Sequence, residues 1–174
     1  MMKMYIAAHE DKSEILALYK DVIDHVNRSS IRLGWNIDIY PDPGFIDHEV
    51  DNRTMLIWRE DSRIIAAAAA NHTVNPEYDS VDWDIKEPKD KISTIHALAV
   101  HPEKQGSRTS YSVLSDIEDH CRKRGDTAIH LDVIDGNIPA YKLYSRNEYK
   151  EMACIRMYYE VVGTRDFYMM EKIL

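Results

Sequence analysis

Cysteine is scarce in this chain of 174 residues: only Cys121 and Cys154 are present, and neither stands at the spacing of a metal site. Two buried thiols in a reducing cytoplasm are expected, rather than a disulfide. Long apolar runs are also missing. The longest, Ile64 to Ala70, is far shorter than the about 20 residues that a membrane-spanning helix needs. The N-terminus shows no secretory signal. We therefore expect a cytoplasmic protein that has no metal site and does not enter a membrane.

Positive charge is in deficit, because 22 Lys and Arg face 30 Asp and Glu, for a formal net charge of −8. An acidic surface repels phosphate backbones, so nucleic acid is not an expected partner. A cationic substrate would be favoured if the charge gathers near a site. A Walker-type lysine and a Rossmann glycine set are also missing, which disfavours other phosphate-binding α/β enzymes. The length and the 44% apolar content fit one globular domain over residues 1–174.

Apolar periodicity predicts strands and helices that interchange along the chain. Asp11 stands three residues before Glu14, a capping-box spacing that predicts a helix start. A run of five alanines follows a tight turn, and we assign it to a strand because it is too short for a stable helix. The expected helices cover residues 11–27, 45–50, 110–123 and 138–145. The expected strands cover residues 4–8, 55–58, 64–71, 81–85, 92–100, 128–133, 155–162 and 167–173.

The most informative stretch begins at residue 92. A buried strand runs into a polar turn at His101-Pro102, a polar loop follows, and a helix then opens. Such a junction offers unpaired N–H groups and the positive end of the helix dipole, so pyrophosphate is a natural ligand there. About 30 residues later come a second strand, a turn with Asn137, and a short helix carrying Tyr141 and Tyr144.

These pieces resemble the GNAT superfamily of N-acyltransferases. The matching motifs are L-A-V-H-P-E-K-Q-G, a helix ending in Gly125, L-D-V with Asn137 and Leu143-Tyr144, and a terminal N-E-Y. The resemblance covers residues 92 to 149, and the earlier elements agree with it as a coarse pattern. It implies an α/β fold with a mixed, mostly antiparallel sheet of about seven strands flanked by about four helices. It also implies acetyl-CoA as co-substrate and direct attack by the primary amine of a small molecule or peptide. A homodimer is left open.

The resemblance also implies a set of CoA contacts. The pantetheine arm would lie beside Leu98, Ala99 and Val100 and use their backbone groups. Further contacts would come from Asn137 and from the loop residues Gln105, Gly106, Ser107, Arg108, Thr109, Ser110 and Tyr111. Arg108 and Ser110 replace small residues of the family loop. Arg108 would either obstruct the phosphates or pair with one of them.

Direct amine attack needs an acid for the departing thiolate and a base for the ammonium. The tyrosine of the family's last helix corresponds to Tyr144, which we expect to be the acid; the alternative is a packing aromatic. For the base we expect His96, placed on the strand face shared with Leu98 and Val100, with an ordinary pKa of about 6.5. The alternative is a hydrogen-bonded core histidine. Thr94 stands where some family members carry a glutamate base.

Residues of the loops complete the expected site. His72 or a carboxylate of the acidic insert, acting through water, is the fallback base. The acceptor pocket is expected to be lined by Trp35, Tyr40, His72 and Trp83. Both tryptophans can equally be loop anchors, and Asp82 and Asp84 are expected on a solvated face. The altered loop supports one rival from another class: a degenerate GNAT fold that binds a ligand or protein without catalysis.

Overall fold

The computed structural model describes all 174 residues, and its centre is a seven-stranded sheet in the order β1-β2-β3-β4-β5-β7-β6. All neighbouring strands run antiparallel except β4 and β5, which are parallel. The strands are β1 (Lys3–Ile6), β2 (Met55–Glu60), β3 (Arg63–Asn71), β4 (Ile92–Val100), β5 (Ala128–Ile134), β6 (Lys150–Tyr159) and β7 (Gly163–Ile173). The α-helices are α1 (Lys12–Val26), α2 (Pro43–Asp51), α3 (Thr109–Arg124) and α4 (Ile138–Arg146). The predicted fold class is confirmed. None of the helices is both long and apolar enough to cross a membrane.

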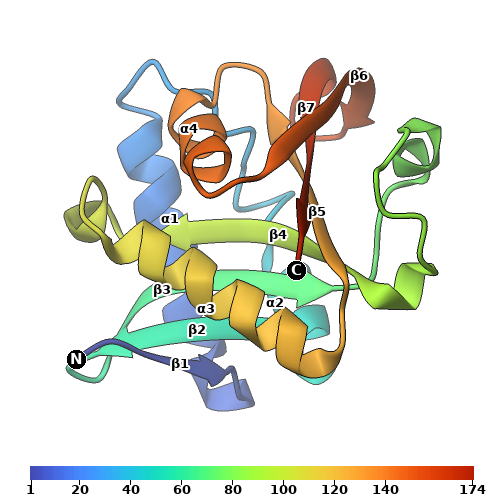
Figure 1. Cartoon of the computed structure of the whole chain (residues 1–174). Coiled ribbons are helices and arrows are strands. Elements are labelled where there is room, and N and C mark those ends of the chain that lie inside the picture. Colours follow the sequence, from blue (N-terminus) through green and yellow to red (C-terminus); the bar gives the residue numbers. More distant parts are fainter.

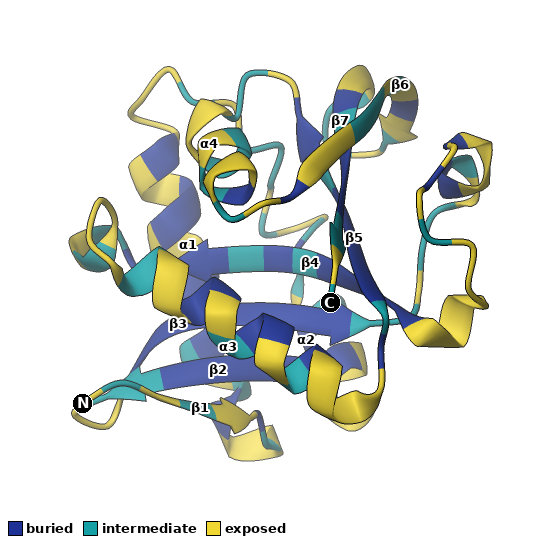
Figure 2. Ribbon diagram, viewed as in Figure 1, coloured by how far each residue is buried: buried dark blue, intermediate teal, exposed yellow.

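The helices cover the two faces of the sheet (Figure 1). On one face, α3 buries Val113, Leu114 and Ile117 in a core that also receives Tyr144 from α4. On the other face, α1 and α2 bury a second apolar stripe that includes Ile15. The sheet thus has an α3/α4 face and an α1/α2 face. The central strands β2, β3, β4 and β5 are mostly buried, whereas β1 and β6 are largely exposed (Figure 2).

The alanine run lies in β3, as predicted, and all five side chains from Ala66 to Ala70 are fully buried. Ala66, Ala68 and Ala70 pack in the core under α3, whereas Ala67 packs in the core under α1. A strand covered on both faces needs an apolar residue at every position, not an alternating pattern. That requirement explains why an apparently helical composition forms a strand here.

The parallel pair β4–β5 joins the two halves of the sheet through few residues, and this junction is called the seam below. The two strands are paired only where Ile92–Thr94 meets Ala128–His130. Beyond that point β4 stays paired with β3, and β5 stays paired with β7 as far as Ile134. The two strands therefore diverge, and Figure 1 shows β5 leaving the plane of β4.

A β-bulge interrupts β4 at Ala97, whose φ is +51°. Two β4 residues stand opposite one β3 residue there, so the side-chain alternation shifts by one. Ile95, Leu98 and Val100 pack in the α3 core, whereas Ala97 packs in the α1 core. His96 directly precedes the bulge, and its side chain points to the face opposite that of its neighbour Ile95. The prediction that His96 shares a face with Leu98 and Val100 is therefore wrong, because it assumed a regular strand.

The predicted strand at residues 81–85 is also wrong. This segment is an irregular loop between two short 3₁₀ helices, Pro76–Ser80 and Lys89–Lys91. Val81 and Trp83 are buried against the side of β5 and β7, and the Trp83 indole N–H donates to the Tyr78 carbonyl at 2.9 Å. The apolar alternation reflects this anchoring and not strand pairing.

Two smaller expectations fail at the surface. No capping box joins Asp11 to Glu14: Asp11 accepts the Ala8 N–H at 2.8 Å, whereas Glu14 accepts the Ile64 N–H at 2.7 Å. Asp11 therefore caps the short 3₁₀ turn His9–Asp11 that precedes α1, and Glu14 links α1 to β3. Of the two cysteines, Cys121 is buried but Cys154 is exposed on β6.

Candidate active site

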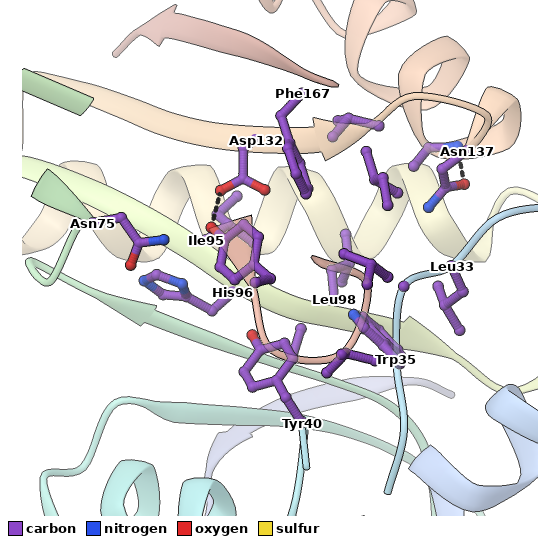
Figure 3. A pocket seen from close by; sticks show the side chains of 18 of the residues that line it. Leu33, Trp35, Tyr40, Asn75, Ile95, His96, Leu98, Asp132, Asn137 and Phe167 are labelled. Atoms are coloured by element: carbon purple, nitrogen blue, oxygen red, sulfur yellow. Dashed lines mark hydrogen bonds between the residues drawn. The ribbon is translucent and has the colours of Figure 1, made fainter. Parts of the chain in front are cut away.

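A cavity of about 420 Å³ opens where β4 and β5 diverge. Figure 3 shows side chains from both strands and from the loop before α2 entering this space. Six of the residues singled out from the sequence line it: Trp35, Tyr40, His96, Leu98, Asn137 and Tyr144. The cavity therefore gathers the expected acid and base in one space.

The register of β4 and β5 explains which side chains face each other. Thr94 is paired with His130, the last pair before the strands diverge, so the residues two positions further, His96 and Asp132, point to the same face as that pair. Leu131 and Val133 of β5 point to the opposite face, into the α3 core. His96 and Asp132 thus enter the cavity from neighbouring strands, as Figure 3 shows.

A chain of hydrogen bonds sets the orientation of the His96 ring. Its Nε2 lies 3.1 Å from Asn71 Oδ1 and 3.0 Å from the Thr73 carbonyl oxygen. Asn71 Nδ2 donates to both carboxylate oxygens of Glu49, at 3.1 and 3.0 Å, and Asn71 Oδ1 accepts the Thr73 N–H at 2.8 Å. The Asn71 amide orientation is therefore determined, and both neighbours of Nε2 are acceptors. The ring must carry its proton on Nε2, which leaves the lone pair on Nδ1 without a protein partner.

Burial lowers the pKa of His96; the charges of Asp132 and Glu49 and the bond to Thr73 oppose this without reversing it. The ring is therefore neutral at pH 7. A neutral imidazole with a free Nδ1 lone pair can accept a proton from a group in the cavity.

Tyr144 enters the same cavity from α4 and is only 7% exposed. Its hydroxyl makes no hydrogen bond within the protein. Burial, with a smaller contribution from the charge of Asp132, raises its pKa well above the usual range. The phenol keeps its proton at neutral pH, and it can therefore donate that proton to a thiolate.

Asp132 was not singled out from the sequence. Its Oδ2 accepts hydrogen bonds from the Tyr78 hydroxyl at 2.8 Å and the Tyr159 hydroxyl at 2.9 Å, whereas Oδ1 has no protein partner. Burial raises the pKa of this carboxyl, and the two hydroxyls oppose that shift. A signal for it did exist: Asp132 is the one acid in the apolar strand A-I-H-L-D-V-I, and an acid placed among buried residues often marks a functional site.

The loop after β4 has the geometry expected of an anion-binding junction. Its glycine, Gly106, has a φ of +71°, and a Cβ built there would meet nothing within 4 Å. Five N–H groups of the loop and of the first turn of α3 have no partner within the protein: those of Gly106, Ser107, Arg108, Ser110 and Tyr111. The Thr109 N–H donates to Ser107 Oγ at 3.2 Å. Unpaired N–H groups at a helix N-terminus attract phosphate.

Arg108 fits this loop without strain. Its φ of −70° and ψ of −4° are ordinary helical values, so no glycine is needed there. Its side chain is exposed and makes no ion pair, and thus its charge is free. Gln105, which was expected to contact CoA, instead bonds within the protein: its Nε2 donates to the Val100 carbonyl at 2.9 Å.

His72 and Trp83 lie outside this cavity. Both line a second cavity of about 310 Å³ beside His130. The Trp83 ring stacks on His130 with centroids 3.7 Å apart, and His72 Nε2 lies 2.9 Å from Asp126 Oδ1. The structure therefore separates these two residues from the other expected acceptor residues, Trp35 and Tyr40.

The fold and this loop–cavity arrangement agree with a sequence comparison. Residues 14–149 match the model of the acetyltransferase (GNAT) family. The chain belongs to the GNAT acetyltransferase family, whose members use acetyl-CoA as the acetyl donor. Comparison with curated proteins yields no significant match.

Solved structures with the same fold come from several bacteria. A GNAT-family acetyltransferase of Streptococcus agalactiae superposes with a TM-score of 0.80 at 16% identity, over 99% of this chain and 95% of that one. YncA of Salmonella typhimurium, solved with its cofactor acetyl-CoA, gives 0.69 at 18% identity over 99% and 94%. The ribosomal-protein-alanine N-acetyltransferase of Brucella melitensis gives 0.72 at 17% identity over 99% of both chains. At these identities the likeness concerns the fold.

Proposed function

We propose that this protein is an N-acetyltransferase, which transfers the acetyl group of acetyl-CoA directly to the primary amine of a small molecule or peptide. The observation that carries the proposal is the union, in one cavity, of a neutral His96 with a free Nδ1 and a protonated Tyr144 with a free hydroxyl. The name of the Brucella neighbour, an N-acetyltransferase of an alanine, supports the choice of an amine.

The donor would bind along the α3/α4 side. In this proposal the unpaired N–H groups from Gly106 to Tyr111 hold the pyrophosphate, and the free Arg108 guanidinium pairs with a CoA phosphate. The pantetheine arm follows β4 past Val100 and Leu98 towards the cavity. The Asn137 side chain accepts the Ala140 N–H at 3.3 Å, which leaves its amide N–H groups for the donor.

The acceptor amine would bind on the opposite side of the seam. One proton of the ammonium passes to His96 Nδ1, and the free amine attacks the thioester carbonyl carbon. The new N–C bond forms and the C–S bond breaks. The leaving thiolate takes the proton of Tyr144, which is replaced by the second proton released from the nitrogen. The products are an amide, CoA with a free thiol, and a proton on His96.

The test is release of free thiol from acetyl-CoA in the presence of a panel of primary amines. We expect turnover that depends on the amine and falls when Tyr144 is replaced by Phe. The matched control is Tyr158→Phe, because Tyr158 is exposed at 64% on β6, outside the cavity. If acetyl-CoA raises the melting temperature but no amine releases thiol, the protein is the non-catalytic member of the fold instead.

A further inference from the structure

The cavity has two chemically different sides. Leu98 and Tyr144, the residues assigned to the donor, pack with the α3 core. His96 and Asp132 lie on the other face of the diverging strands. Whatever occupies the second side meets the carboxylate of Asp132, which enters the cavity from β5 (Figure 3).

The Asp132 carboxyl is held in place through one oxygen, and its other oxygen has no hydrogen-bond partner within the protein. The Tyr78 and Tyr159 hydroxyls both bond to Oδ2, so the side chain cannot rotate freely. Oδ1 faces the cavity with no protein donor. Burial raises the pKa of this carboxyl, and a positively charged donor at Oδ1 opposes that rise because it stabilises the ionised form. Charge-assisted hydrogen bonds are about twice as strong as neutral ones, so a cationic donor is the partner that stabilises this group most.

The walls around this oxygen are aromatic and carry no positive charge. Five aromatic side chains line the acceptor side: Trp35, Tyr40, Tyr78, Tyr159 and Phe167. No lysine or arginine lines the cavity, and the one other acidic residue, Glu160, is exposed. A carboxylate or phosphate on the acceptor would therefore lie in an apolar space without a counter-ion, which is costly. An ammonium finds both a carboxylate and ring faces, which attract cations.

We propose that Oδ1 of Asp132 docks the ammonium of the acceptor, and that the acceptors are monoamines with an aromatic or apolar body and no acidic group. This inference rests on the proposed acetyl transfer and specifies its substrate class. Asp132 orients the nitrogen between itself and His96 Nδ1, which takes the proton before attack. The structure supports this geometry, because both side chains line the same cavity, two residues beyond the last paired residues, Thr94 and His130.

The substrate class is tested with matched acceptors that differ by one acidic group. Wild-type protein is assayed with 2-phenylethylamine and with free L-phenylalanine, which is the same skeleton plus a carboxylate. We expect kcat/KM to be at least about a hundredfold higher for the amine, because the carboxylate would be buried unpaired. Equal kcat/KM for both acceptors would overturn the inference while leaving acetyl transfer intact.

The docking role of Asp132 is tested by binding, without chemistry. The probe is N,N-dimethyl-2-phenylethylamine, a cation that cannot form a stable amide, titrated calorimetrically into protein loaded with CoA. Asp132→Asn should weaken binding by about tenfold or more, the loss expected when a charge-assisted bond becomes a neutral one. The control is Asp135→Asn, since Asp135 is exposed in the turn directly after β5 and does not line the cavity. Unchanged affinity in folded Asp132→Asn would refute the docking role.

A comparison on the wild-type protein covers the case in which Asp132→Asn does not fold. Affinity for 2-phenylethanol, a neutral analogue of 2-phenylethylamine, should be about tenfold or more below that for the dimethylamine probe. Comparable affinities would count against a carboxylate anchor. If the probe binds in an Asp132-dependent manner but no amine is acetylated, the docking site stands and the proposed transferase activity fails.

Discussion

Replacing His96 by Gln tests the proposed general base directly. The His96 ring contacts Asn71 Oδ1 and the Thr73 carbonyl through Nε2. A glutamine amide can donate hydrogen bonds to the same acceptors. It has no basic nitrogen to replace Nδ1. The substitution therefore removes the base while it retains most of the local structure.

The effects on rate and on stability should differ in size. Loss of a general base lowers kcat/KM for the acceptor by roughly 10² to 10⁴, or about 2.7–5.5 kcal/mol of barrier. Loss of one hydrogen bond lowers the free energy of unfolding by only about 0.5–1.5 kcal/mol. For a chain of this size that shifts the melting temperature by roughly 2–4 °C per kcal/mol. If His96 were only a core histidine, the variant would show the same small change in stability but would keep its turnover per folded molecule.

The pH dependence gives a second, independent signature. Burial lowers the pKa of His96 in the folded protein, so the acidic limb of kcat/KM should lie below the ordinary histidine value of about 6.5. Because the folded pKa is the lower one, the unfolded chain binds the proton first. The stability that this group contributes is present above about pH 6.5 and is lost as the pH falls through the folded pKa. His96→Gln should remove both the limb and this loss of stability.

The assay measures kcat/KM and the melting temperature over the same pH range, with two amines of different pKa. A limb that belongs to the amine moves with the amine, whereas the limb of His96 stays in place. His25→Gln is the matched control, because His25 is exposed on α1. A folded His96→Gln variant with the wild-type acidic limb would refute the assignment and redirect the search to other groups facing the cavity.

Three further outcomes are expected. Tyr144→Phe should lower kcat by roughly 10² to 10⁴ with the Kd of acetyl-CoA unchanged, because it removes only the proton donor. Single-turnover thiol release measures this rate, and an unchanged rate would mean that Tyr144 only packs in the core. Gly106→Glu should abolish the rise in melting temperature that CoA produces, because it places a negative charge among the unpaired N–H groups; a retained shift would move the phosphate site elsewhere. Arg108→Ala should weaken CoA by about threefold to tenfold and dephospho-CoA by less, as calorimetry can measure. Tighter CoA binding by Arg108→Gly than by the wild type would show that the arginine obstructs the loop.

Most of the fold could be predicted because its signals are local. The tight turn before β3 and the shortness of the alanine run together assigned that run to a strand. The motifs around β4 and β5 placed α3 and α4 within one residue of their observed bounds. The failed strand prediction at residues 81–85 has a clear cause. Residues 81–85 alternate like a strand, yet their apolar members are fixed by tertiary contacts of Trp83 with Tyr78 and His130. A pattern of burial does not reveal whether a sheet or a loop produces it.

The site was predicted less completely, since its geometry depends on features without a local mark. No glycine or proline in β4 marks the bulge at Ala97 in the sequence. Because of that bulge, the side chains of His96 and Leu98 point to opposite faces of the sheet. Asp132 is held by two tyrosines that lie 54 and 27 positions away along the chain. Only the three-dimensional arrangement brings such groups together. His72 and Trp83, chosen from the same acidic insert, were expected in this site and lie at another cavity.

The position of the cavity follows from how the sheet is assembled. β4 is bonded along its length to β3, and β5 to β7, so each strand belongs firmly to one half of the sheet. The halves meet through three paired residues on each side of the parallel seam. Parallel pairing is slightly weaker per residue than antiparallel pairing. Backbone groups of β4 beyond Thr94 therefore face a gap instead of a strand.

Buried backbone groups need partners, and Gln105 already supplies one for the Val100 carbonyl. The pantetheine arm of acetyl-CoA contains amides that can supply others. Donor binding would then provide hydrogen-bond partners for the β4 backbone groups that β5 does not pair.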